Sequence, residues 1–573
     1  MTYLADLRRE LDFILFDWLG EADDGTARPL LDLSQRLAGD LFASHYRLGD
    51  EQEPRLIDGR VRVTPESKRA MAAYAEAGLF AMSFSPAAGG MGLSQLLSAA
   101  SYLMFATANI STAAYILLTS ANARLFAAFG SRAQVDAFAL PQIKGRWFGT
   151  MCLSEPGAGS SLADIAARAR ADGEDELGPR FRITGQKMWI SGGEQDVSEN
   201  IVHLVLAKIV GPDGEVGPGT SGISLFAVPR ILPDGSLNDV NVAGLNHKLG
   251  YRGIPNCALN FGEGLQLPEG AAGAIGWRIG AEGSGLRQMF QMMNEARIGV
   301  SLGAAGVGYR AFRQSLGYAG ERIQGKGTEG SGNVPILSHP DVQRMLAEQK
   351  YYCEAALAMT LYAARLADSG DRDMLDLLTP IVKSWTSSFT LRANDQAIQI
   401  HGGYGYTRDF DVELLWRDNR LNPIHEGTNG IQAIDLLERK LLRGGSALER
   451  LRGHIDETAA RARRDEGLAP LAGSLLAAWA DVERAIDGAR AAGLRQRLFG
   501  ASALLDAIGH VVAGWLLLDQ LADRSIAGDD PHLDGKRRSC ALFYAIEFPK
   551  LAAWLSIVGH EDIHHLANMA HEF

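Results

Sequence analysis

The sequence predicts a mainly α-helical protein with a central β domain. Apolar residues recur three and four positions apart over residues 4–144, and the same period returns from about residue 286 onward. Between these segments, residues 147–261 contain short β-rich runs separated by turns. The 573 residues are enough for several domains of roughly 150 residues each. We expect these domains at residues 1–146, 147–275, 276–444 and 445–573.

The first segment is predicted to be helical throughout. Leu4, Leu7, Leu11 and Ile14 fall on one face of an amphipathic helix. The same residues lack the basic-then-apolar plan of a signal peptide. An N-terminal helical domain is therefore expected.

The second segment is predicted to form a small antiparallel sandwich or barrel. Its runs of β-branched and aromatic residues are residues 181–184, 200–206, 222–228 and 257–261. The turns at residues 211–219 and 233–236 are rich in Gly, Pro and Asp, which favour turn conformations. Short strands at such regular spacing are typical of these closed or two-layered sheets.

Long helices are predicted for the rest of the chain. Helical periods cover residues 297–322, 339–368 and 373–400, and another begins after Thr428. The glycine-rich residues 325–332 (GKGTEGSG) are expected to form an exposed loop. After Gly445 the sequence predicts a further set of helices.

Composition and charge narrow the class of protein. Hydrophobic residues make up 46% and charged residues 22%, as in folded globular proteins. The net charge of −12 disfavours nonspecific binding of nucleic acid. Four scattered cysteines indicate neither a disulfide framework nor a zinc site, so a cytoplasmic location is expected. The apolar residues 502–518 include Asp506 and His510, so no membrane span is expected.

A polar, glycine-rich turn follows the first predicted strand at residues 151–161 (MCLSEPGAGSS). Glycines allow backbone amides to approach an anion closely, and serine hydroxyls can add hydrogen bonds. The turn is therefore a candidate site for a phosphate or for the edge of a flavin. A tight turn without a ligand is the commoner meaning of such a short motif.

A second candidate lies at a strand end, at residues 186–193 (QKMWISGG). Trp189 can cover a planar ring system while Ser191 and nearby amides bind its polar edge. Alternatively, Trp189 belongs to the core, which is the more usual place for a tryptophan.

The third candidate combines residues 399–406 (QIHGGYGY) with residues 424–430 (IHEGTNG). Glu426 is predicted to lie in a loop, and Thr428 or Asn429 can cap the helix that follows. Gly427 leaves the carboxylate unobstructed. Considered alone, a glutamate near a helix N-terminus more often stabilises the helix dipole than acts as a base.

Taken together and in this order, the three motifs resemble the acyl-CoA dehydrogenase family over about residues 71–440. The resemblance implies an N-terminal helical domain, a middle β domain and a C-terminal four-helix domain, with FAD between the last two and reaching across a subunit interface. It implies a homo-oligomer, either a dimer or a tetramer. It also implies that a base removes the α-proton of an acyl-CoA thioester, that the flavin takes the β-hydride, and that an electron-transfer flavoprotein receives the electrons.

The resemblance assigns residues as well. It implies that the FAD-binding residues are Met151, Leu153, Ser154, Ser160, Trp189, Ile190, Ser191, Arg322, Gln399, His401, Gly402, Gly403, Thr428 and Gly430. It implies that the substrate-binding residues are Ser160, Asn294, Arg297 and Gly427. Glu426 falls at the position of the catalytic base. Some branches carry the base one residue before the arginine, but that position is Ala296, which cannot act.

We expect no metal site. His560, His564, His565 and His571 could place two ligands on one helical face, but no carboxylate or cysteine completes a set. A surface or interface role fits them better.

Two features resemble a longer branch of the family that includes the 3-methylmercaptopropionyl-CoA dehydrogenases. They are the sequences at residues 426–432 (EGTNGIQ) and 436–440 (LLERK), and the helical segment of more than a hundred residues after Gly445. Two alternatives stay open. An acyl-CoA oxidase would use the same carboxylate, and a DNA-binding flavoprotein of the adaptive-response type also has additional C-terminal helices but requires a basic face.

Overall fold

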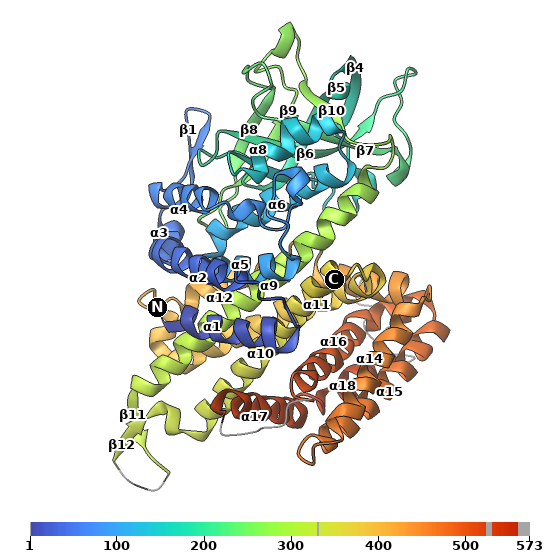
Figure 1. Cartoon of the computed structure of the whole chain (residues 1–573). Helices are drawn as coiled ribbons and strands as arrows, with labels where there is room; N and C mark the ends of the chain where they lie inside the picture. Colours follow the sequence, from blue (N-terminus) through green and yellow to red (C-terminus); the bar gives the residue numbers. More distant parts are fainter. Residues whose placement is uncertain (1, 329, 331, 523–529, 560–573) are drawn as a thin grey trace, which may run out of the picture. The chain divides into compact units, whose positions relative to one another are not determined.

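The computed structural model describes residues 2–328, 330, 332–522 and 530–559. The chain forms two compact units, whose elements are labelled in Figure 1. One unit, the β unit, is Thr26–Ala296. The other, the helical unit, combines Met1–Gly25 with Arg297–Phe573. The mainly helical class with a central sheet is confirmed.

The β unit starts with helices whose beginnings are capped by side chains. In α4 (Pro65–Glu76) the preceding Thr64 hydroxyl accepts from Ser67 N–H, and proline occupies the first helical position. Ser94 caps α5 (Gln95–Ala108) and Asn109 caps α6 (Ile110–Phe129) in the same way. α5 and α6 are apolar on most sides, and most of their residues are buried.

A small hairpin corrects the expectation of an all-helical first segment. β1 (Arg55–Ile57) pairs in antiparallel register with β2 (Arg60–Arg62). The two turn residues, Asp58 and Gly59, have φ of 50° and 73°. Asp-Gly is a preferred pair for such a two-residue hairpin turn, so the local sequence does contain the signal for this element.

The sheet of the β unit has eight strands. They are β3 (Trp147–Cys152), β4 (Arg168–Asp175), β5 (Gly178–Ser191), β6 (Asn200–Ile209), β7 (Ile223–Pro229), β8 (Val240–Leu245), β9 (Asn256–Phe261) and β10 (Ala274–Arg278). Their order is β10-β7-β6-β4-β5-β9-β8, with β3 beside β6. A second pairing of β10 with β5 closes part of the sheet into a ring. The sheet is not purely antiparallel, because β3 and β4 both run parallel to β6.

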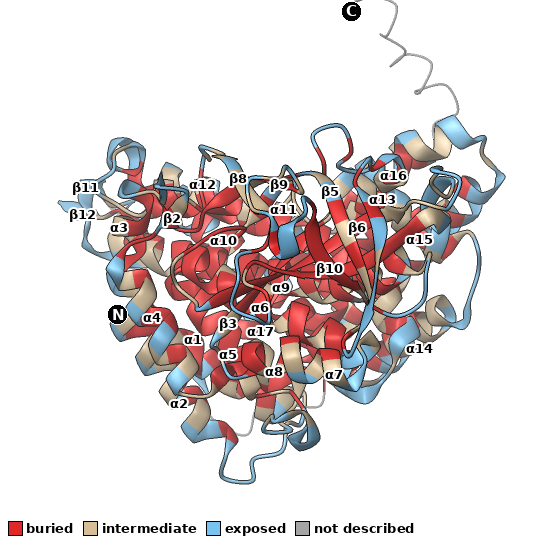
Figure 2. Cartoon of the chain, turned by 90° about the horizontal axis from the view of Figure 1, so that it is seen from above, coloured by how far each residue is buried: buried red, intermediate tan, exposed pale blue. Residues whose placement is uncertain are grey.

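Two apolar clusters hold the sheet. Val205, Phe226 and Phe261 belong to one cluster, and the fully buried β7 contributes alternate residues to both clusters. On another side, Phe138 packs on Trp277 of β10 with ring centroids 5.6 Å apart. Figure 2 shows that residues of the sheet such as those of β6 and β10 are largely buried. The strand ends that carry the candidate motifs therefore project from a rigid core.

Long helices build the helical unit. α9 (Gly285–Glu321) begins in the β unit and continues here, followed by α10 (Pro340–Ser369), α11 (Arg372–His401), α12 (Val412–Asn419) and α13 (Asn429–Ile434). α10 packs along α11. Gly370 has φ of 73° at the end of α10, and the Asp371 side chain caps α11 by accepting from Met374 N–H.

Additional helices complete this unit. They are α1 (Thr2–Asp12), α14 (Ser446–Ala462), α15 (Ala469–Ala491), α16 (Leu494–Asp519), α17 (Pro531–Ile546) and α18 (Lys550–Gly559). α16 is long and apolar enough to cross a membrane, and α17 with α18 meets the same criterion as one bent pair. However, α16 packs against α10, α11, α15 and α18, and 83% of its most apolar window is buried. We interpret α16 as a core helix.

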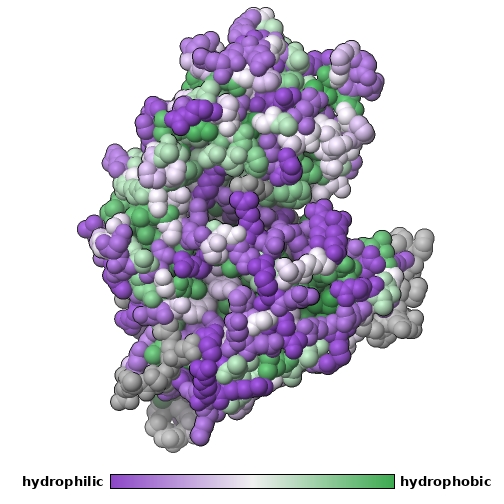
Figure 3. Space-filling model, turned by 45° about the vertical axis from the view of Figure 1, so that its right-hand side comes forward, coloured by the Kyte–Doolittle hydropathy of each residue, from purple (hydrophilic) through white to green (hydrophobic). Residues whose placement is uncertain are grey.

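Two surface features remain. The glycine-rich tract, expected as a loop, joins β11 (Ile323–Lys326) to β12 (Asn333–Pro335) in an exposed hairpin. Hydrophilic residues cover most of the face drawn in Figure 3, and hydrophobic residues lie there in small groups. The histidines weighed above as metal ligands, residues 560, 564, 565 and 571, lie outside the described residues.

Candidate active site

Two of the sequence motifs meet in the β unit. The backbone N–H of Met188 donates to the carbonyl oxygen of Ser154 over 2.9 Å. Beside this bond, the fully buried Lys187 ammonium donates to the Leu153 carbonyl at 3.1 Å and to the Glu155 carboxylate at 2.8 Å. The turn after β3 is thus fixed to the end of β5. Met151 lies in β3 itself, Leu153, Ser154 and Ser160 belong to the turn, and Trp189, Ile190 and Ser191 belong to the strand end.

Trp189 has an unusual backbone and an unusual exposure. Its φ is 66°, a left-handed conformation that costs a bulky residue about 1–3 kcal/mol. The pairing of β5 with β9 is irregular between Lys187 and Ile190, which re-aims this part of the strand. The Trp189 side chain is 62% exposed, whereas Ile190 is buried. The alternative that Trp189 belongs to the core is therefore wrong.

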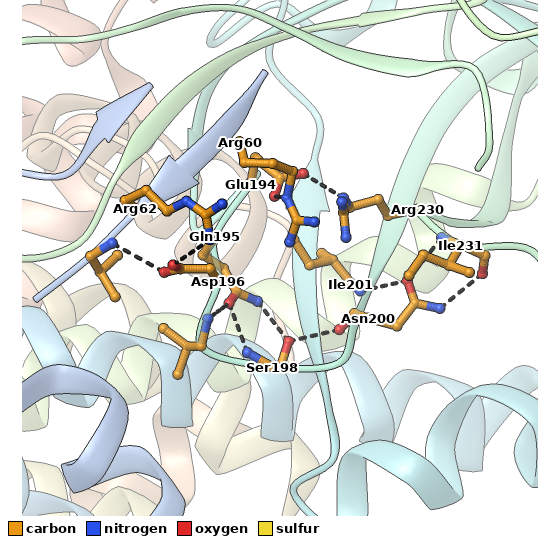
Figure 4. A network of polar contacts seen from close by, with 12 residues as sticks. Arg60, Arg62, Glu194, Gln195, Asp196, Ser198, Asn200, Ile201, Arg230 and Ile231 are labelled. Carbon is orange, nitrogen blue, oxygen red and sulfur yellow. Dashed lines mark hydrogen bonds and ion pairs between the residues drawn. The ribbon is translucent and has the colours of Figure 1, made fainter. Parts of the chain in front are cut away.

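Ion pairs hold the segment that follows Ser191. Figure 4 shows the Glu194 carboxylate between Arg60, which donates at 3.0 Å, and Arg230, at 2.6 Å. Burial raises the pKa of Glu194, although both guanidinium groups lower it. The strand end is thereby tied to the β1–β2 hairpin and to the residue after β7.

Asp196 adds a second anchor to the same segment. Its carboxylate accepts from Val63 N–H at 3.1 Å, from Arg62 at 3.2 Å and from Lys68 at 2.5 Å. Burial alone would raise the pKa of Asp196, but these hydrogen bonds outweigh it and lower the pKa. Asp196 is therefore stabilised in its charged form.

The third motif forms a strained loop in the helical unit. Glu426 and Gly427, between α12 and α13, have φ of 54° and 84°. Thr428 caps α13 by accepting from Ile431 N–H at 3.4 Å, which decides between the two caps considered above. The Glu426 carbonyl accepts from Gln432 Nε2 at 2.9 Å and from the buried Arg297 Nε at 3.4 Å. The structure thus brings Arg297 to the loop that contains Glu426, Gly427 and Thr428, and Gly430 follows in the first turn of α13.

The electrostatics of this loop suit a base. Burial raises the pKa of the half-buried Glu426, while Arg297 and Lys383 lower it by a smaller amount. Lys383 lies on α11 beneath the loop, and burial lowers its pKa to about 7. Burial and the Lys383 charge lower the pKa of His425 to about 3, so this neighbour is neutral at pH 7. A carboxylate with a raised pKa is a stronger base than one in water.

The remaining predicted residues, apart from Asn294, lie in the helical unit. The His401 ring, at the end of α11, stacks on Tyr318 with centroids 4.2 Å apart. The Arg322 guanidinium lies over the Tyr404 ring at 5.9 Å. No atom lies within 4 Å of a Cβ built on Gly402 or Gly403. Gln399 lies on the last turn of α11. Asn294 is part of the stretch of α9 that belongs to the β unit.

Each unit has features that suit part of a flavin dinucleotide. In the β unit, an indole held outside the core on a strained strand end provides a surface for a planar ring, and Gly157 and Gly159 leave open backbone. In the helical unit, Gly402 and Gly403 leave open backbone and Arg322 adds a positive charge, as a diphosphate requires.

Sequence reasoning missed Lys383. The residue lies in an apolar run, residues 380–385 (PIVKSW), within a predicted helix. A lysine inside such a run is a weak signal, because lysines can also extend from a buried position to water.

Comparisons with known proteins identify the family. The chain matches "Acyl-CoA dehydrogenase, middle domain" over residues 150–263 and "Acyl-CoA dehydrogenase, C-terminal domain" over residues 283–442. It also matches "Acetyl-CoA dehydrogenase C-terminal like" over residues 451–567.

Several curated proteins are similar to this chain. A 3-methylmercaptopropionyl-CoA dehydrogenase of Ruegeria pomeroyi is 36% identical over 75% of this chain and 73% of its own length. A butyryl-CoA dehydrogenase of Syntrophomonas wolfei is 35% identical over 69% of this chain and 67% of its own length. The broad-specificity linear acyl-CoA dehydrogenase FadE5 of Mycobacterium tuberculosis is 31% identical over 98% of both chains.

Solved structures agree in fold. ACDH-11 of Caenorhabditis elegans, in complex with C11-CoA, superposes with a TM-score of 0.78 at 20% identity over 97% of this chain and 94% of its own. An acyl-CoA dehydrogenase of Bacillus anthracis, complexed with FAD, superposes with a TM-score of 0.77 at 20% identity over 97% of this chain and 93% of its own. The chain belongs to the acyl-CoA dehydrogenase family and is an FAD-dependent oxidoreductase that acts on acyl-CoA.

Proposed function

We propose that this enzyme converts linear acyl-CoA thioesters to trans-2-enoyl-CoA products, with Glu426 as the base. The observation that carries the proposal is the Glu426 carboxylate in its strained loop, beside the buried Arg297 and with a raised pKa. The names of three relatives support linear substrates, since one acts on butyryl-CoA, one on 3-methylmercaptopropionyl-CoA and one broadly on linear acyl-CoA.

The proposed chemistry follows from the weak acidity of a thioester α-proton. Removing this proton places negative charge on the thioester oxygen, so the oxygen needs a hydrogen-bond donor. The backbone N–H of Glu426 is our candidate donor, since it lies next to the proposed base. A bound acyl chain excludes water and raises the pKa of the carboxylate further towards neutral pH.

FAD supplies the hydride acceptor when it is bound. We propose that Met151, Leu153, Ser154, Ser160, Trp189, Ile190, Ser191, Arg322, Gln399, His401, Gly402, Gly403, Thr428 and Gly430 hold this cofactor. We propose that Ser160, Asn294, Arg297 and Gly427 bind the substrate. Arg297 has a second role in this proposal, because its guanidinium hydrogen-bonds the Glu426 carbonyl and so helps to orient the loop.

The physiological partners are part of the same proposal. We propose an electron-transfer flavoprotein as electron acceptor, a homo-oligomeric enzyme and a cytoplasmic role in fatty-acid β-oxidation. The family relationship supports the reaction type, and an oxidase that passes electrons to oxygen is the competing possibility.

Anaerobic flavin bleaching tests the reaction and its substrate. The purified FAD-loaded enzyme is mixed with butyryl-, octanoyl-, palmitoyl- and 3-methylmercaptopropionyl-CoA, and the enoyl product is identified by mass. Glu426→Gln should retain FAD but lose about 10²-fold or more of the bleaching rate. Near-normal bleaching in that variant would remove Glu426 from the role. In air, stoichiometric hydrogen peroxide with acyl-CoA would favour the oxidase.

A further inference from the structure

Among the residues that the structure describes, the hydrogen-bond partners of the buried Lys383 ammonium are two neutral oxygens. Its side chain on α11 has 0% exposure. The Nζ atom donates to the Gly427 carbonyl at 2.7 Å and to Asn429 Oδ1 at 3.0 Å. In the part of the chain that the structure describes, no carboxylate forms an ion pair with it. Burying an ammonium without a directly paired anion is costly, so its position needs an explanation other than stability.

Asn429 is oriented to face this ammonium. Its Nδ2 donates to Ser388 Oγ at 2.8 Å and to the Ser384 carbonyl at 3.3 Å, both on α11. The other end of the amide, Oδ1, is therefore turned towards Lys383. The first residue of α13 thus connects the loop to α11 through its side chain.

The contact with Gly427 acts on the bend that carries Glu426. Both residues of the bend have positive φ, which for Glu426 is unfavourable and needs support from its surroundings. Gln432 and Arg297 hold the Glu426 carbonyl, and Lys383 holds the next carbonyl along the chain. Two successive peptide groups are therefore fixed by donors that belong to other parts of the helical unit.

The charge of Lys383 acts electrostatically on Glu426. The groups whose charges influence this site are Glu426, Arg297 and His425, and Asp435 and Asp376 act on Arg297. The Asp435 carboxylate Oδ2 lies 3.7 Å from Arg297 Nη1, and the Asp376 carboxylate pairs with Lys440. Both acids therefore pair with cations other than Lys383. His425 is neutral at pH 7. Lys383 therefore acts mainly on Glu426.

We propose that Lys383 is the positioning residue of the base loop: it fixes the Glu426–Gly427 bend through the Gly427 carbonyl, and its charge favours the ionised Glu426 carboxylate. This inference rests on the proposed role of Glu426. A buried cation under the loop offsets part of the rise in the pKa of Glu426 that burial causes. The base is thereby desolvated while a neighbouring charge favours its ionised form.

The pH profile of kcat/KM for the FAD-loaded enzyme tests the electrostatic part. In Lys383→Met the acid limb should move to higher pH by about one unit, since an adjacent opposite charge shifts a carboxyl pKa by that much or more. Lys383→Arg retains the charge and should keep the acid limb close to that of the wild type. Lys536→Met is the matched control, because Lys536 is also buried in the helical unit but bonds Glu10 and Gln520.

Asn429→Leu tests the positioning part separately. It leaves the charge of Lys383 in place but removes one of the acceptors that orient the ammonium. We expect a several-fold fall in kcat with an unmoved acid limb. This variant and Lys383→Arg keep the inference testable even where Lys383→Met does not fold.

Urea unfolding provides a readout that does not depend on turnover. A lysine whose pKa is lower in the folded state than in the unfolded state makes stability rise with pH between the two values. The Lys383→Met variant should lose this rise in stability above about pH 7. The lost slope corresponds to about one proton, namely the proton that the unfolded state binds and the folded state does not.

The outcomes separate this inference from the proposed function. An acid limb in Lys383→Met that superimposes on that of the wild type, with Glu426→Gln inactive, overturns the role of Lys383 and leaves Glu426 as the base. Full activity of Glu426→Gln overturns the proposed function and this inference with it. A shift of equal size in Lys536→Met would also overturn the inference, because it would show a general effect of losing a buried lysine.

Discussion

The strand end at Trp189 and the loop at Glu426 both contain an unfavourable backbone conformation. Carboxylates anchor the first region, whereas cations anchor the second. Trp189 has φ of 66° and Glu426 has φ of 54°. Behind Trp189, the carboxylates of Glu194 and Asp196 lie on the segment itself and bind cations elsewhere in the β unit. Beneath Glu426 the arrangement is reversed, because cations from α9 and α11 bind carbonyl groups of the loop.

This difference separates two kinds of support. The anchors behind Trp189 fix a backbone whose side chain, which we propose to contact the flavin, carries no charge, so their loss should change stability and cofactor retention only. The anchors beneath Glu426 are also electrostatic neighbours of the proposed base. Their loss should change the pH dependence of the reaction as well.

Among changes to the backbone and the anchors of the two regions, the largest effect is expected from replacing Gly427 in the loop that carries Glu426. A Cβ on Gly427 would lie 2.6 Å from Gln432 Nε2, and its φ of 84° disfavours any other residue. Strain of about 1–3 kcal/mol should therefore make Gly427→Ala roughly 10- to 100-fold slower in single-turnover flavin reduction. Gly453→Ala, on α14 where nothing lies within 4 Å, is the control. Equal rates in Gly427→Ala and the wild type would show that the bend is not needed.

A smaller effect is expected from the β unit. Asp196→Ala removes the acceptor of three hydrogen bonds, so the free energy of unfolding should fall by about 2–3 kcal/mol. Because the pKa of Asp196 is lowered in the folded state, its contribution is present above the ordinary aspartate value of 3.8 and is lost as pH falls below it. Urea unfolding at pH 5 and 8 should therefore give the same loss.

The control for that measurement is an exposed pair. Asp136 binds Arg132 on the surface at 2.8 Å, so Asp136→Ala should cost less than about 1 kcal/mol. If Asp196→Ala shifted the pH profile of turnover, the anchors of the β unit would also influence the pH dependence of the reaction. That result would contradict the distinction between the two regions.

The smallest expected effect is a gain in stability, in contrast to the losses described above. Since the pKa of Glu426 is raised in the folded state, the stability that this group contributes is complete below its ordinary value of 4.5 and is lost as pH rises through the raised pKa. Glu426→Gln should therefore be more stable than the wild type at pH 8 by up to about 1 kcal/mol, with little difference at pH 4.5. Thermal unfolding of both proteins at these two pH values measures the gain, and a loss of stability at pH 8 would contradict it.

Local sequence predicted most of the fold. The strands at β5, β6, β7 and β9 and the long helices follow directly from apolar periodicity and turn residues. The Asp58-Gly59 pair is an adequate sequence signal for the β1–β2 hairpin. The helical periodicity on either side of the pair obscured this signal. The parallel pairing of β3 and β4 with β6 had none, because strand direction depends on how the chain returns to the sheet and not on the residues of the strand.

The residues of the candidate site were predicted from local sequence motifs, and their long-range contacts were not. The residues around Ser154 and Trp189 are joined in the structure, and so are Arg297 and Glu426. No property of residues 380–385 indicates that Lys383 points at the Gly427 carbonyl, because that contact joins positions 44 residues apart. Long-range contacts of this kind become visible only once the helices are packed.

The discontinuous helical unit has a consequence for the order in which the protein is made. Trp18, which is synthesised hundreds of residues before Asp519, donates its indole N–H to the Asp519 carboxylate at 2.8 Å, and Met1–Gly25 belong to the same unit as Arg297–Phe573. The β unit, Thr26–Ala296, is a continuous stretch and can fold while the ribosome is still translating the rest. Glu10 of α1 and Trp18 bind partners that emerge hundreds of residues later, so the unit that holds Glu426 is completed only after those partners have been synthesised.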